Sequence, residues 1–122
     1  MIGYVTLGTN NLKKAAAFYD KIAAEMGIGR FMESDTFIAW GSDDGSAGVG
    51  LTQPFDGKPM SVGNGVMVAL AAKDKAQVDS IYKLALSIGG TDEGPPGQRG
   101  EGFYAAYFRD PEGNKLNAFV MG

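Results

Sequence analysis

The sequence predicts an α+β protein built from two tandem β-α-β-β-β modules. The chain has 122 residues, of which 44% are hydrophobic and 20% charged, as expected for one globular domain with a substantial core. Each half places one helix-like segment after an apolar strand and before shorter strands. The second half also repeats the first at a constant offset of 63 positions, seen in the pairs Tyr4 and Met67, Leu7 and Leu70, Tyr19 and Tyr82, and Gly27 and Gly90.

The first module, about residues 1–53, begins with an apolar strand from Gly3 to Thr9. Asn10 or Asn11 supplies an N-cap for the helix that follows, and Gly27 ends that helix. Three short strands over 30–34, 37–41 and 48–53 complete the module. The apolar face of the helix is defined by spacings of three and four, at Leu12, Ala15, Ala16, Tyr19, Ile22, Ala23 and Met26.

A linker of about residues 54–65 joins this module to the second, about residues 66–122, within a single domain over 1–122. A strand over 66–71 leads to a helix capped by Asp74, whose predicted buried residues are Val78, Ile81, Tyr82, Ala85 and Leu86. A loop rich in glycine and proline is expected over 94–102. Two strands over 103–109 and 115–120 flank a turn over 110–114.

Helices followed by several turn-linked strands favour antiparallel returns over a doubly wound parallel sheet. Each helix then covers one face of its own sheet and leaves the other face open. We therefore expect a curved eight-stranded mixed sheet around a central pocket shared by the two modules.

Composition excludes several functions. A net charge of −3 and a pI of about 4.8 argue against nucleic-acid binding. No run approaches the roughly 20 apolar residues of a membrane span, and the N-terminus shows no signal-peptide pattern, so a cytoplasmic location is expected. The chain has no histidine and no cysteine, which excludes a Ser-His-Asp triad, a thiolate nucleophile and a cysteine-bound zinc.

The duplicated layout, together with Thr6-Leu7-Gly8, Ala17-Phe18-Tyr19 and the closing Asp110-Pro111-Glu112-Gly113-Asn114-Lys115-Leu116, resembles the vicinal oxygen chelate superfamily. This group contains glyoxalase I, the bleomycin resistance proteins and the extradiol dioxygenases. The resemblance covers essentially the whole chain. It implies the fold predicted above and a functional cavity between the modules.

In the metal-dependent members of this superfamily, four strands supply histidine and carboxylate or amide ligands. The matching positions here are Tyr4, Met67 and Asn117, with Gly50 at the fourth or, if the register shifts by one, Leu51. These side chains are poor ligands for a divalent ion, and no histidine or cysteine can replace them. We therefore predict that the metal site is absent and that the protein needs no cofactor.

The cavity could still bind a small molecule. If the last turn pairs Arg109 with Lys115 and Tyr107 with Asn117, alternation puts five residues on one face of two strands. We predict an aromatic site with Arg99 on a loop beside it. Simpler readings stay open: the aromatic and methionine side chains could fill a collapsed core, Trp40 could be core, and Arg99 could be a solvated loop charge. The predicted ligand-binding residues are Tyr4, Trp40, Met67, Arg99, Phe103, Tyr107, Asn117 and Phe119.

The first hypothesis for function is a metal-free binding protein of the bleomycin-resistance kind, with a small aromatic or amphipathic ligand. The alternative is a metal-independent enzyme in which Tyr4 or Tyr107 is the acid or base and Asn117 or Arg99 holds an oxyanion. A third is a glyoxalase I-like lyase with an unusual metal site. We expect a homodimer, the commonest oligomer, and no nucleic-acid or membrane partner.

Overall fold

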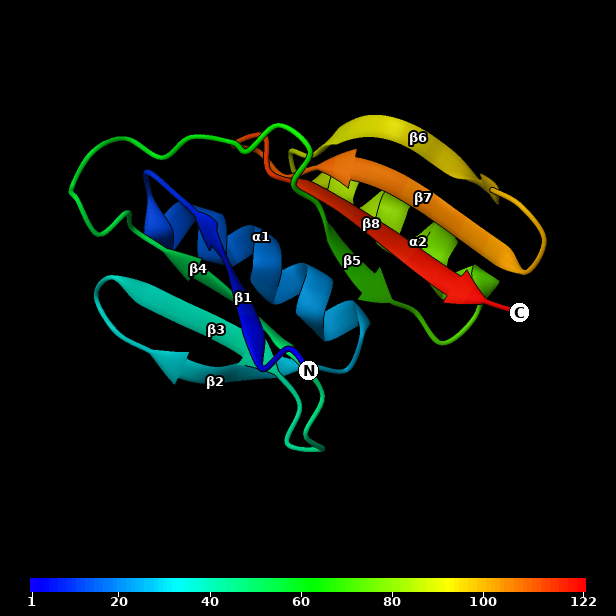
Figure 1. Cartoon of the computed structure of the whole chain (residues 1–122), viewed down its shortest axis with the longest axis horizontal. Helices are drawn as coiled ribbons and strands as arrows, with labels where there is room; N and C mark the ends of the chain where they lie inside the picture. Colours follow the sequence, from blue (N-terminus) through cyan, green and yellow to red (C-terminus); the bar gives the residue numbers. More distant parts are fainter. The chain divides into compact units, whose positions relative to one another are not determined.

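The structure is a computed structural model that describes residues 1–122 and divides into two compact units, Met1–Gly63 and Asn64–Gly122. The division falls within the segment predicted as a linker. Each unit contains one strand, one helix and three further strands, in that order, and each forms its own four-stranded mixed sheet (Figure 1). The α+β class and the two tandem β-α-β-β-β modules are therefore confirmed.

The first unit has the strand order β1-β4-β3-β2. Strand β1 runs parallel to β4, and the other two pairings are antiparallel. The sequence predicts these strands to within one residue at most ends. Their bounds are β1 Tyr4–Gly8, α1 Leu12–Glu25, β2 Gly29–Glu33, β3 Phe37–Gly41 and β4 Gly48–Thr52.

The second unit repeats this topology with the order β5-β8-β7-β6, in which β5 is parallel to β8. Thr6 is paired with Gly50 in the first sheet, and Ala69, the residue 63 positions after Thr6, is paired with Asn117 in the second. The repeat is thus visible in strand register as well as in sequence. The bounds are β5 Val68–Ala71, α2 Lys75–Ser87, β6 Thr91–Gln98, β7 Phe103–Arg109 and β8 Lys115–Met121.

Both helices begin at a side-chain cap. Asn11 accepts a hydrogen bond of 3.1 Å from the backbone N–H of Lys14, and Asp74 accepts one of 2.8 Å from Gln77. Each bond satisfies an N–H that has no partner within its own helix. At the other end of α1, Gly27 adopts a φ of +72°, the left-handed conformation that commonly ends a helix.

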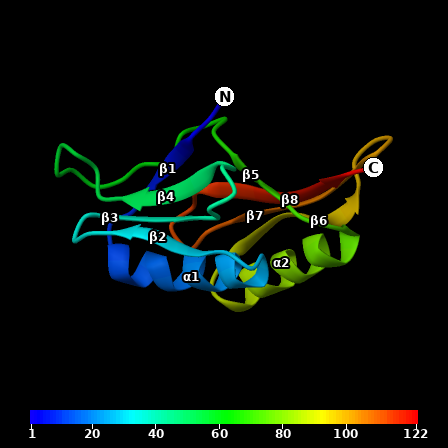
Figure 2. The same cartoon turned by 90° about the horizontal axis from the view of Figure 1, so that it is seen from below.

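Each helix covers one face of its own sheet, and Figure 2 shows this arrangement from below. In the first unit, Leu7, Ile38 and Leu51 are buried against α1; in the second, Phe108 and Leu116 are fully buried on the side of α2. Burying such a side chain contributes about 1.5–3 kcal/mol. The face of each sheet that points away from its own helix is called the open face below.

The predicted loop over 94–102 is wrong in its first half, because Thr91–Gln98 forms strand β6. Prolines interrupt a sheet ladder because they lack an N–H, which was the reason for expecting a loop. Here β6 lies at the edge of its sheet and its register with β7 shifts on both sides of Gly94, so Pro95 and Pro96 occupy an irregular stretch. Edge strands and bulges are where proline is tolerated.

The helix faces also needed small corrections. Leu86, predicted to be buried, is 36% exposed, and Tyr82 and Met26 are half-buried. Phe18, absent from the predicted face of α1, is also buried, and its ring meets that of Tyr19 edge-on. Neither helix is long and apolar enough to cross a membrane.

Candidate functional site

The open face of the second unit brings together most of the predicted ligand-binding residues. The turn over 110–114 closes through a hydrogen bond of 2.9 Å from the Asp110 N–H to the Asn114 carbonyl, and this turn sets the register of β7 with β8. Tyr107 is consequently paired with Asn117, as predicted from sequence. Alternation along the two strands then puts Phe103, Ala105, Tyr107, Asn117 and Phe119 on one face.

Asn117 is the most unusual side chain of this face. It is only 1% exposed, and its Oδ1 has no hydrogen-bond partner. An unsatisfied buried polar atom costs about 1–3 kcal/mol, so nearly all such atoms in folded proteins are paired. Asn117 lies between Tyr107 on β7 and Ala69 on β5. A ligand that donates an N–H or O–H there would recover this cost.

The ring of Tyr107 is flanked by two cations. Arg99 Cζ and Lys115 Nζ each lie 5.6 Å from the ring centroid, within the range of cation–π contacts. Arg99 folds back towards β6 and donates a hydrogen bond to the Pro95 carbonyl. Gly97 makes room for this arrangement, because a Cβ there would lie 2.8 Å from the Arg99 guanidinium.

Lys115 was not among the predicted site residues. A usable signal was present in the sequence, because Lys115 precedes Asn117 by two positions in a strand, and residues two apart share a face. From the sequence alone, Lys115 is assigned only as the cross-strand partner of Arg109.

Two further groups complete the second unit. Phe103 and Phe119 stack at a centroid distance of 5.8 Å with an angle of 30° between their planes. The two rings form an aromatic surface on this face. Met67 lies one residue before β5 and is 39% exposed.

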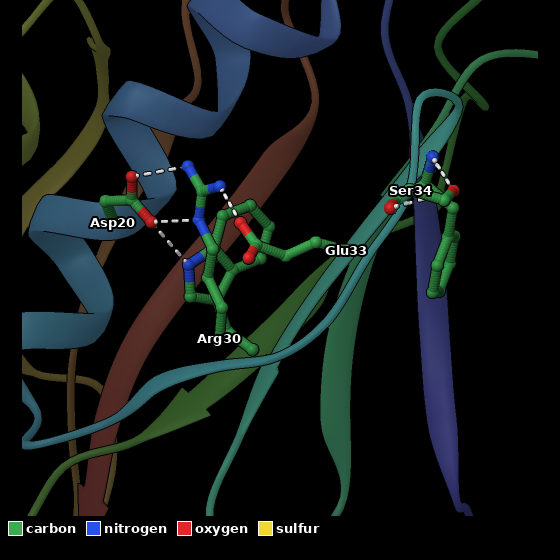
Figure 3. Close-up of polar contacts among 6 residues, drawn as sticks. Asp20, Arg30, Glu33 and Ser34 are labelled. Atoms are coloured by element: carbon green, nitrogen blue, oxygen red, sulfur yellow. Dashed lines mark hydrogen bonds and ion pairs between the residues drawn. The ribbon is translucent and has the colours of Figure 1, made fainter.

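The first unit has an aromatic open face of its own. Tyr4 is 60% exposed and meets Phe37 edge-on at 6.2 Å, and Phe31 is 55% exposed. Glycines lie beneath these rings: a Cβ on Gly50 would lie 2.7 Å from the Phe37 ring, and one on Gly48 would lie 3.0 Å from Phe31. The rings lie against the sheet because side chains are missing there. Figure 3 shows Ser34, whose hydroxyl accepts a hydrogen bond of 3.1 Å from the Phe37 N–H and so fixes the start of β3.

Trp40 lies on the other face of this sheet and is apart from the open-face residues. It is 4% exposed, contacts Tyr19 of α1 at a centroid distance of 5.6 Å, and donates a hydrogen bond of 2.9 Å to Asp20. Of its two interpretations, the structure therefore supports a core residue. The reason is strand parity, since Trp40 pairs with Arg30 and Val49 while Ala39 pairs with Gly50.

Around Trp40 the side chains form a compact ionic cluster (Figure 3). Arg30 donates two hydrogen bonds of 2.8 and 2.7 Å to the carboxylate of Asp20, and also contacts Glu33. The bond from Arg30, together with that from Trp40, holds the pKa of the Asp20 carboxyl below its ordinary value, and the two carboxylates raise the pKa of Arg30. The cluster joins α1 to β2 and β3.

The donor set does not fit the metal site of the metal-dependent relatives. The fourth-strand position is Gly50 rather than Leu51, because Leu51 is fully buried on the helix side. The four matching positions thus offer a phenol, no side chain, a thioether and one amide. Nowhere in the chain do three or more acidic, histidine or cysteine side chains gather closely enough to hold an ion. Hard or borderline divalent ions need more anionic or imidazole ligands than these positions supply.

A separate depression of about 420 Å³ lies in the first unit beside the start of α1. Leu12, Ile38 and Arg30 contribute to its lining, together with polar groups of the adjoining turns. None of the predicted ligand-binding residues lines it. It belongs to the junction between helix and sheet rather than to an open face.

Comparisons with known proteins agree with this architecture. A family model described as Glyoxalase/Bleomycin resistance protein/Dioxygenase superfamily matches residues 1–118. A glyoxalase/bleomycin resistance protein from Albidiferax ferrireducens T118 is 35% identical, with a TM-score of 0.90 over 98% of this chain and 97% of that chain. A comparison with curated proteins gave no match.

More distant solved structures share the fold alone. A glyoxalase/bleomycin resistance protein/dioxygenase family enzyme from Burkholderia phytofirmans PsJN is 18% identical, with a TM-score of 0.78 over 98% of each chain. A lactoylglutathione lyase from Agrobacterium tumefaciens is 22% identical, with a TM-score of 0.71 over 98% of this chain and 92% of that chain.

Proposed function

Because the chain belongs to the glyoxalase/bleomycin resistance protein/dioxygenase superfamily, we propose that it binds a small aromatic or amphipathic molecule, without a metal, on the open face of its second unit. The observation that carries this proposal is the buried, unpartnered Oδ1 of Asn117 within an aromatic face. Small-molecule sites combine apolar and aromatic walls with a few polar groups that orient the ligand.

Each side chain has a distinct part in this binding. The stacked rings of Phe103 and Phe119 offer a flat apolar surface for an aromatic ligand. Asn117 accepts a hydrogen bond from a hydroxyl or N–H of the ligand. The donor set argues for binding without metal chemistry, because the positions matching the metal ligands do not suit a divalent ion.

The test is an NMR titration of ¹⁵N-labelled protein with para-cresol and with para-xylene, which has a methyl group in place of the hydroxyl. We expect both probes to shift the backbone amides of β7 and β8 around Tyr107 and Asn117, with para-cresol bound more tightly. Asn117→Leu should weaken para-cresol about tenfold, the value of one hydrogen bond, and leave para-xylene unchanged. Shifts confined to the first unit, or no saturable shifts, would refute the proposal.

A further inference from the structure

The open face of the second unit holds two cations without a carboxylate partner. Arg109 on the same unit is paired with Glu93, and Arg30 in the first unit is paired with Asp20 and Glu33. Arg99 and Lys115 make no such pair; their contacts are the Tyr107 ring and, for Arg99, the Pro95 carbonyl. The ion pair of this unit is made by Arg109 instead, although the chain carries 14 acidic and 11 basic residues.

These two cations converge on one ring. Both lie 5.6 Å from the centroid of Tyr107, and like charges held at one ring repel each other. An anion bound beside the ring would relieve this repulsion and gain charge-assisted hydrogen bonds from both side chains. Glu93, an acidic residue of β6, is paired with Arg109, so its negative charge is offset.

The guanidinium of Arg99 also lies against the backbone of its own unit. Its guanidinium rests over β6, where Gly94 and Gly97 leave the space that side chains would otherwise fill. A Cβ on Gly94 would lie 3.3 Å from both the guanidinium and the Tyr107 ring. Gly94 has a φ of +152°, at the limit of the region that L side chains avoid.

We propose that the ligand of this face is an aromatic anion: its charged group is bound by Arg99 and Lys115 beside Tyr107, and its hydroxyl or N–H donates to Asn117. This inference rests on the proposed function, because it assigns the chemical class of the molecule that the face binds. Lys115 and Asn117 lie two residues apart on β8 and Tyr107 is the cross-strand partner of Asn117, so the three groups are neighbours on one surface. A small aromatic carboxylate with a hydrogen-bond donor satisfies all of them.

Four para-substituted benzenes separate the two parts of this recognition. para-Hydroxybenzoate carries the anion and the donor, methyl para-hydroxybenzoate carries only the donor, para-methoxybenzoate carries only the anion, and para-cresol is the neutral reference. The acid with a donor should bind at least tenfold more tightly than its methyl ester, because hydrogen bonds to charged groups are stronger than neutral ones. Affinities come from the saturable shifts of the β7 and β8 amides.

Charge-removing variants identify the groups responsible. Arg99→Gln and Lys115→Gln should each weaken para-hydroxybenzoate several-fold, and together by about the whole advantage of the acid over its ester. Neither should change the affinity for the ester by more than about twofold. Lys83→Gln, an exposed residue of α2, is the matched control for the loss of one positive charge and should bind like the unmodified protein.

Each outcome decides something different. Equal affinities for acid and ester, or a loss in Lys83→Gln as large as in Arg99→Gln, would overturn the anion inference and leave the proposed function standing. Absence of saturable shifts on β7 and β8 with all four probes would refute the proposed function itself.

Discussion

The indole Nε1 of Trp40 donates a hydrogen bond of 2.9 Å to Oδ1 of Asp20. Arg30 donates two further hydrogen bonds to the same carboxylate. The single tryptophan of the chain is thereby tied to the helix side of its sheet. The hydrogen bonds from Arg30, together with the one from Trp40, hold the pKa of the Asp20 carboxyl below its ordinary value, and this predicts how the stability of the first unit depends on pH.

Asp20 should stabilise the fold only while it is ionised. Its folded pKa lies below the ordinary value of 3.8, so the contribution is complete above that value and is lost as the pH falls through the folded pKa. Asp20→Asn should lower the free energy of unfolding by about 0.5–1 kcal/mol at pH 7, a modest value because the side chain is 42% exposed and screened by solvent. Urea unfolding at pH 7 and pH 3 measures this, and an unchanged gap between variant and parent at pH 3 would contradict it.

Gly90 should tolerate no side chain. A Cβ there would lie 2.7 Å from the Arg109 carbonyl oxygen and 2.8 Å from that of Ala85, and backbone atoms cannot move aside cheaply. Gly90→Ala should therefore lower the free energy of unfolding by about 1–3 kcal/mol in chemical denaturation. Gly29→Ala is the control, because nothing lies within 4 Å of its added Cβ. Equal stabilities for the two variants would show that the close approach at Gly90 is not limiting.

Gly97→Ala should displace the guanidinium of Arg99 while leaving its positive charge in the protein. The added Cβ would lie 2.8 Å from the guanidinium, which is the end of a flexible side chain and can move. Stability in urea should change little, whereas the affinity for para-hydroxybenzoate should fall several-fold and that for the methyl ester should not. A loss of affinity for both probes would indicate a general distortion of β6 instead.

The protein should contain no stoichiometric divalent metal after purification. Its matching positions offer too few ligands of suitable chemistry, and glycine at position 50 offers none. Elemental analysis for zinc, nickel, iron and manganese checks this, with para-cresol binding measured before and after dialysis against EDTA. One tightly bound metal per chain, or loss of binding in EDTA, would contradict the prediction.

Strand parity explains what could be predicted from the sequence. The turn at Asp110–Asn114 has a recognisable composition, and it fixed the pairing of Tyr107 with Asn117 correctly. The offset of 63 likewise located both modules and aligned Thr6 with Ala69, whose strand partners are Gly50 and Asn117. Short-range rules suffice where a turn or a repeat sets the register.

The rest depended on contacts that a linear pattern does not contain. Strand β6 was missed because two prolines normally exclude a strand, and only its place at the sheet edge permits them. The sequence does not show that Trp40 belongs to the core, because its partners, Asp20 and Tyr19, lie about 20 residues earlier on a helix. The folding back of Arg99 onto Tyr107 required knowing that Gly97 lies beneath it.

The stability of Asn117 variants tests whether the open face of the second unit is a binding site. If the side chain is satisfied within the fold, replacing it should lower the free energy of unfolding. If its oxygen has no partner in the free protein, the buried unsatisfied group destabilises the fold, and an apolar replacement removes that penalty. Asn117→Leu, which has a similar volume and no polar atom, should therefore raise the free energy of unfolding by about 1 kcal/mol in urea.

The matched control for that variant lies three residues earlier. Asn114 is also buried, but its amide donates a hydrogen bond of 2.9 Å to Asp110 and it closes the turn. Asn114→Leu should therefore lower the free energy of unfolding by about 1–3 kcal/mol, because it removes a hydrogen bond to the buried carboxylate of Asp110. A higher free energy of unfolding for Asn117→Leu and a lower one for Asn114→Leu would show that the native side chain destabilises the free protein at position 117 and stabilises it at position 114. A loss of stability in both variants would show that Asn117 is satisfied within the fold and would remove the main support for a ligand there.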